Sequence, residues 1–202
     1  MKIILATLLC VVSSTAAHAQ LLKNPMKGSG GSTVSAAQIL DKYSLAAQST
    51  LNAYAPLLEA VGLKEDAAAA TAQAKNLTQG PLSSKDLEET ARSYTDITKK
   101  IEENFKDESL ELGAEAKEHF KVAGINLAAA SLAYVATAVD VKAYKPSAAD
   151  LQAAKVAVEV GKGVPNDMST LKNVIGMVID YSKAKGLPID AGLEKAMAAL
   201  EF

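Results

Sequence analysis

Few residue types in this 202-residue chain could perform chemistry. Past the first twenty positions there is one histidine, His119, which follows Glu115 at a spacing of four and Glu118 directly. A carboxylate-bridged di-iron centre needs a Glu-x-x-His pair on each of two helices, and catalytic zinc needs more ligands than one imidazole supplies. The ligand count therefore predicts no metal site, and His119 is interpreted as an ordinary histidine at the rim of the protein.

The residues for covalent and redox chemistry are also missing. The single cysteine, Cys10, lies in an apolar run near the start, and the sequence contains neither a C-x-x-C-H haem attachment motif nor a G-x-S-x-G nucleophile elbow. Paired glutamates such as Glu88-Glu89 occur among lysines on a solvated helix face, where pKa shifts are least expected. We therefore predict a protein that is not an enzyme and holds no cofactor.

Four side chains form the one candidate ligand site. His119 and Asn126 lie on one line of a helix, with Thr137 beside that line and Tyr134 in the following turns. An imidazole, an amide and a hydroxyl at the rim of an apolar slot would suit a small amphiphilic ligand. The same groups would also suit hydrogen bonds between helices, because a buried amide left unpaired costs about 1 to 3 kcal/mol.

The helix that carries these residues is predicted at about 114–143 and is unusually apolar. Residues 122–139 contain no charge. That length would allow a membrane span, but nearly half of the stretch is alanine or glycine, and polar side chains interrupt it, so we predict no span.

Two apolar stripes run along this helix. Ile125, Leu132 and Val139 repeat every seven residues, and the stripe of Leu127 and Tyr134 lies about 200° away from them at 3.6 residues per turn. A helix that is apolar on opposite sides belongs in the centre of a globule, so we expect both stripes to be buried.

The fold class predicted from these patterns is all-α, an antiparallel helical bundle of five to seven helices around a buried central helix at about 114–143. Breaking and capping residues set the other boundaries. The first expected helices are 34–61, which Pro56 kinks or interrupts and Gly62 ends, then 65–77, and a helix from the Ser83-Asp86 capping box to about 105. After the central helix, a second capping-box pattern at 147–150 opens a helix through about Gly161 that Gly161 to Pro165 break, followed by a helix from Asp167 or Ser169 to Gly186 and a last one at 190–200.

The first nineteen residues predict the compartment. Lys2, the apolar run 3–12 and Ala17-His18-Ala19 are typical of a bacterial secretory signal peptide, cleaved between Ala19 and Gln20. Cys10 would leave with it, so the working protein would contain no disulfide. Residues 20–33, rich in glycine and serine, are interpreted as a flexible N-terminal tether, which leaves 34–202 as a single alanine-rich helical domain.

Composition narrows the class of partner. The chain has 21 basic and 23 acidic side chains. This small acidic excess predicts neither nucleic acid nor an anionic membrane as partner. Its many alanines allow either close helix packing or a groove between helices. We expect an exported, periplasmic or secreted, non-enzymatic protein of the bacterial envelope that acts by binding or structural interaction with an envelope protein. The alternative is a carrier for a small apolar ligand or lipid in a groove beside the central helix.

Overall fold

The computed structural model describes residues 34–107, 109–110, 112–146, 151–189 and 191–200. These residues are 82% helical and contain no strand, which confirms the predicted all-α bundle of five to seven helices. The predicted signal peptide (1–19) and tether (20–33) lie outside the described residues. The six described helices are α2 (Ala36–Ala60), α3 (Lys64–Asn76), α4 (Ser84–Phe105), α5 (Ala116–Ala143), α6 (Leu151–Lys185) and α7 (Ala191–Ala199).

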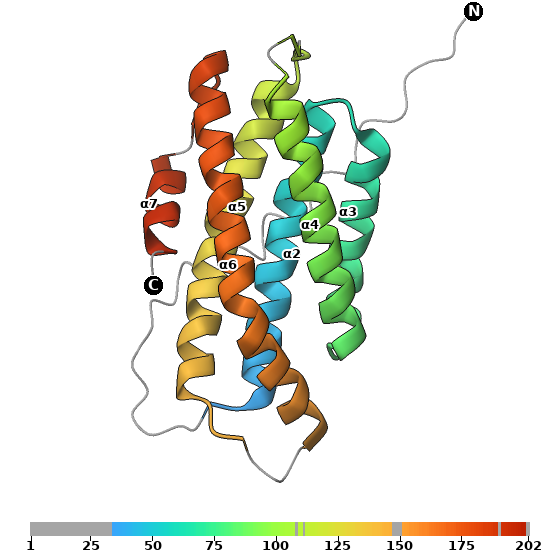
Figure 1. Cartoon of the computed structure of the whole chain (residues 1–202), viewed down its shortest axis with the longest axis vertical. Coiled ribbons are helices and arrows are strands. Elements are labelled where there is room, and N and C mark those ends of the chain that lie inside the picture. The colour runs from blue at the N-terminus through green and yellow to red at the C-terminus, as the bar shows by residue number, and fades with distance from the viewer. Residues whose placement is uncertain (1–33, 108, 111, 147–150, 190, 201–202) are drawn as a thin grey trace, which may run out of the picture. The chain divides into compact units, whose positions relative to one another are not determined.

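The helices form an up-and-down bundle in which consecutive helices from α2 to α6 run in alternating directions (Figure 1). Helix α2 contacts α3, α4, α5 and α6, and more than half of its residues are buried. Helix α5 contacts α2, α6 and the short α7. The most enclosed helix of the bundle is therefore α2, and α5 is buried along one side only.

The predicted start of α4 is confirmed by a complete capping box. The Ser83 hydroxyl accepts a hydrogen bond from the Asp86 amide at 3.3 Å, and the Asp86 carboxylate accepts one from the Ser83 amide at 2.8 Å. This reciprocal pair satisfies two amides that the first helical turn leaves without intrahelical partners. Helix α2 starts in the same way at Ser35 and Gln38.

Proline does not interrupt α2. Pro56 has no amide hydrogen, so the carbonyl of Asn52, one turn earlier, loses its intrahelical donor. The Asn126 side-chain amide of α5 donates to that carbonyl at 3.5 Å and to the Val122 carbonyl at 3.0 Å. The neighbouring helix thus supplies part of what the proline removes.

The predicted break at Gly161 to Pro165 is wrong, because the 35-residue helix α6 runs through these positions without interruption. Proline inside a helix costs about 3 kcal/mol, whereas burial of one valine contributes about 1.5 to 3 kcal/mol. A continuous helix keeps Val160, Val164 and Met168 on one buried line across the proline, while Pro165 itself is exposed. Packing therefore outweighs the local penalty.

Gly161 has a packing role that its sequence context did not indicate. A β-carbon at this position would come within 2.9 Å of the Val141 Cγ1 atom. The absence of a side chain therefore lets α5 and α6 approach closely at this point, and the glycine permits packing rather than ending a helix.

Candidate functional site

The structure does not gather the four predicted ligand residues into one pocket. His119 is about one-quarter exposed near the start of α5, with its Nδ1 atom 3.3 Å from Glu59 Oε2 and its Nε2 atom 4.0 Å from Glu115 Oε2. It lines an open cleft of about 730 Å³ at one end of the bundle, together with Lys64 and the segment 113–116. His119 therefore lies at a rim, as the sequence suggested.

The other three predicted residues are engaged in helix structure. Asn126 donates to the backbone carbonyls described above. Thr137 is fully buried, and its hydroxyl donates to the Ala133 carbonyl at 2.8 Å. Tyr134 is fully buried in the middle of the bundle. Asn126 and Tyr134 bond to groups of other helices, as the interhelical alternative required, whereas Thr137 bonds within α5.

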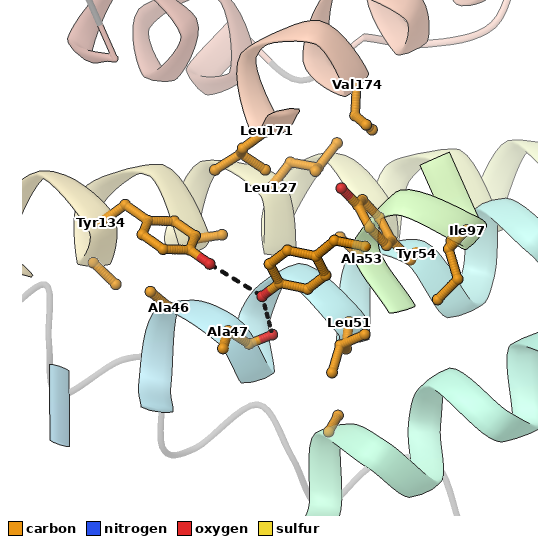
Figure 2. Close-up of a cluster of buried hydrophobic side chains, with 14 of the residues drawn as sticks. Ala46, Ala47, Leu51, Ala53, Tyr54, Ile97, Leu127, Tyr134, Leu171 and Val174 are labelled. Carbon is orange, nitrogen blue, oxygen red and sulfur yellow. Dashed lines mark hydrogen bonds between the residues drawn. The ribbon is translucent and has the colours of Figure 1, made fainter. Parts of the chain in front are cut away.

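A network of tyrosines occupies the place where a groove beside α5 was considered. The Tyr134 hydroxyl donates to the Tyr94 hydroxyl, which donates to the Ala47 carbonyl, each at 3.1 Å. Figure 2 shows these two bonds among leucine, isoleucine and alanine side chains of the core. The chain of bonds connects α5, α4 and α2 through the interior.

Asp167 of α6 joins this cluster as a buried carboxyl group. It is 4% exposed, and the Tyr43 hydroxyl donates to its Oδ2 atom at 3.0 Å. Burial raises the pKa of Asp167 to about 6, against the opposing effect of the Tyr43 hydrogen bond. The pKa values of Tyr43 and Tyr134 are also raised, chiefly by burial.

The burial of the Asp167 carboxyl group was not predicted from the sequence, because Asp167 was expected at the start of a helix. The signal was present in the spacing. Val160, Val164 and Leu171 repeat at intervals of four and seven, and Asp167 falls on the same line. An acidic residue at a core position of an apolar repeat indicates a buried carboxyl.

A second aromatic cluster lies where the C-terminal parts of α4 and α6 meet the first turns of α5. Phe105, Phe120 and Tyr181 come from α4, α5 and α6 and stack with ring centroids 4.2 to 5.7 Å apart. The Tyr181 hydroxyl is buried and has no hydrogen-bond partner within the described part of the chain. The cluster contributes apolar contact among three helices.

The surface feature that stands out is the exposed side of α5. Val122 and Val139 are each 39% exposed, Ile125 is 49% exposed and Leu132 is 47% exposed. The expectation that both stripes of this helix are buried is therefore wrong for the Ile125 stripe. In the described part of the structure α5 contacts α2, α6 and α7, and these four side chains stay exposed beside those contacts.

The exposed face of α5 differs from other helix surfaces of the bundle. The solvent side of α4 carries ion pairs one turn apart, such as Lys85 with Glu89, as expected for a solvated face. The exposed face of α5 has no charge between Lys121 and Asp140. Elsewhere in the described residues the exposed large apolar side chains are Leu151 and Val158. Exposed apolar patches on proteins occur at protein–protein interfaces, membrane-contacting surfaces and ligand grooves.

By length and composition, α5 is also the one helix of the described residues that could cross a membrane. Core helices of water-soluble bundles meet the same criterion, and α5 packs one side against α2 through Leu127 and Tyr134.

No protein family, curated protein or solved structure matches this chain.

Proposed function

We propose that this protein is an exported, non-enzymatic helical bundle of the bacterial envelope that acts by binding another protein through the exposed face of α5. The observation that carries the proposal is the uncharged apolar seam of Val122, Ile125, Leu132 and Val139. Leaving such side chains in water is unfavourable, and each contributes binding free energy when a partner covers it.

The filled interior favours this function over the carrier alternative. A ligand beside α5 would have to displace Tyr134 or Thr137, both fully buried and hydrogen-bonded to protein atoms. A carrier would need the bundle to open there, whereas the seam is accessible as it stands.

The proposed compartment rests on the N-terminal sequence. An apolar run followed by Ala17-His18-Ala19 supports export and cleavage before Gln20. Fractionation of the host cell and intact mass measurement of the isolated protein test this part. A mass that begins at Gln20 in the periplasmic or secreted fraction supports it, and a full-length cytoplasmic protein contradicts it.

The binding function is tested by photocrosslinking in the host cell. A crosslinking amino acid replaces Ile125 or Leu132 on the seam, and Ala91 on the exposed side of α4 as a matched control. We expect a discrete protein adduct at the two seam positions and none at Ala91.

A second substitution shows whether the adduct depends on apolar contact. Val139→Glu places a charge in the seam two turns from Leu132, and we expect at least a tenfold loss of the Leu132 adduct while the circular dichroism spectrum is unchanged. Equal adducts at seam and control positions, or an adduct indifferent to the glutamate, would contradict the proposal.

A further inference from the structure

The seam on α5 has the spacing of a coiled-coil interface. Once Ala129 and Ala136 are counted between its four large residues, its positions alternate at intervals of three and four, which is the heptad pattern of a helix that packs along another helix. Large and small residues alternate from Ile125 to Val139. The first position of each heptad is Val122, Ala129 and Ala136, and the fourth is Ile125, Leu132 and Val139.

This alternation is poorly matched in a parallel pair of identical helices. In such a pair each residue meets its own copy, so Ala129 would face Ala129 and Leu132 would face Leu132. The layers would then alternate between two and eight side-chain carbon atoms over the middle of the seam. Layers so different in volume cannot fill the space between two closely packed helices evenly.

An antiparallel pair of the same helices is evenly filled. First and fourth positions then share a layer, which places Val122 opposite Val139, Ala129 opposite Leu132, and Ala136 opposite Ile125. Every layer holds five or six side-chain carbon atoms. The seam is therefore complementary to itself when turned around, which is the requirement of a two-fold symmetric interface.

We infer that the occupant of the seam is a second copy of this chain, packed antiparallel along α5 with the two-fold axis beside residues 130–131. This inference rests on the proposed function and names the partner at the same surface. The four large side chains are already exposed, so the contact needs no rearrangement of the bundle.

The geometry predicts a weak dimer. The seam is about 25 Å long at 1.5 Å per residue and one helix face wide, so it buries less area than a standard protein interface. The dimer is therefore expected to depend on protein concentration.

Disulfide crosslinking tests both the pairing and its direction. In a chain carrying Cys10→Ala, an introduced cysteine is the only one. Val122→Cys and Val139→Cys are prepared separately, and Ala91→Cys serves as an exposed control on α4. Each is oxidised alone, and the first two are also oxidised as an equimolar mixture. Circular dichroism confirms that each variant retains its helix content.

The expected result is a dimer in the mixture at least fivefold above either variant alone. In the antiparallel pair, Val122 of one copy lies about 25 Å along the axis from Val122 of the other, too far for a disulfide. Efficient crosslinking of Val122→Cys with itself overturns the antiparallel pairing. A mixture that crosslinks no better than Ala91→Cys overturns the second copy as occupant. If photocrosslinking at Ile125 then still yields a heterologous adduct, the proposed function stands and only the identity of the partner is wrong.

Discussion

Replacing Asp167 by asparagine is expected to stabilise the bundle at neutral pH and to leave its stability near pH 4 almost unchanged. The carboxyl group is buried, and its pKa in the folded protein is raised from 3.8 to about 6. The folded state therefore holds the proton more tightly than the unfolded state. This contribution is fully present below pH 3.8, falls as the pH rises, and is lost above about pH 6.

The size of the effect follows from the shift in pKa. A difference of about 2 pH units at 1.36 kcal/mol each corresponds to about 3 kcal/mol of unfolding free energy above pH 7. At pH 4 the same relation gives less than about 1 kcal/mol. Asparagine stays neutral throughout, and its carbonyl oxygen can still accept the hydrogen bond from Tyr43.

Urea unfolding followed by far-UV circular dichroism between pH 4 and 8 measures this effect. The informative quantity is the difference in unfolding free energy between Asp167→Asn and the unsubstituted protein at each pH, because other carboxyl groups titrate equally in both. Asp180→Asn, at an exposed position of the same helix, is the matched control.

The added amide hydrogens of asparagine can shift the difference by a constant amount, since they do not titrate. A difference that is the same at pH 4 and pH 8, or that decreases as the pH rises, would refute a buried carboxyl with a raised pKa at this position.

Three further changes test the packing. Gly161→Ala should lower the unfolding free energy by about 1 kcal/mol or more, because its β-carbon meets Val141. Gly176→Ala, with no neighbour within 4 Å, should raise the unfolding free energy by about 0.5 to 1 kcal/mol. Thermal unfolding compares the two variants, and equal effects would contradict the close approach of α5 and α6. Tyr94→Phe should cost about 1 to 3 kcal/mol in urea unfolding because it leaves the Tyr134 hydroxyl without its acceptor, and a neutral result would argue against the network. Ser83→Ala should cost about 1 kcal/mol through loss of the capping box, with faster amide exchange confined to the first turn of α4; exchange spread over the whole helix would point to another cause.

Local chemistry at helix ends was readable from the sequence. The Ser83 capping box and the glycine ends at Gly62 and Gly186 depend on residues a few positions apart, and both glycines have the positive φ angles that side chains disfavour. Interactions of such short range are encoded next to one another in the chain, so their outcome follows from the order of residues.

The sequence did not predict the outcome where a local helix-breaking signal competes with tertiary packing. Pro165 carries the same local penalty wherever it occurs in a helix interior, yet α6 continues through it. The buried line on both sides of the proline decides the outcome, and that line is set by α5 and α2 across the core. Asp167 was misassigned for the same reason, since a helix assumed to start there would have exposed it.

The sequence by itself determined that the described chain is all helix, where most helices begin and end, and that α5 has two apolar sides, because each follows from periodicity and local capping. Only the tertiary structure decided which apolar side of α5 is covered. Each stripe carries large apolar side chains, so the hydrophobic effect does not distinguish the two stripes until α2, α6 and α7 take their places. The side with Leu127 and Tyr134 receives those helices, and the side with Ile125 and Leu132 stays exposed.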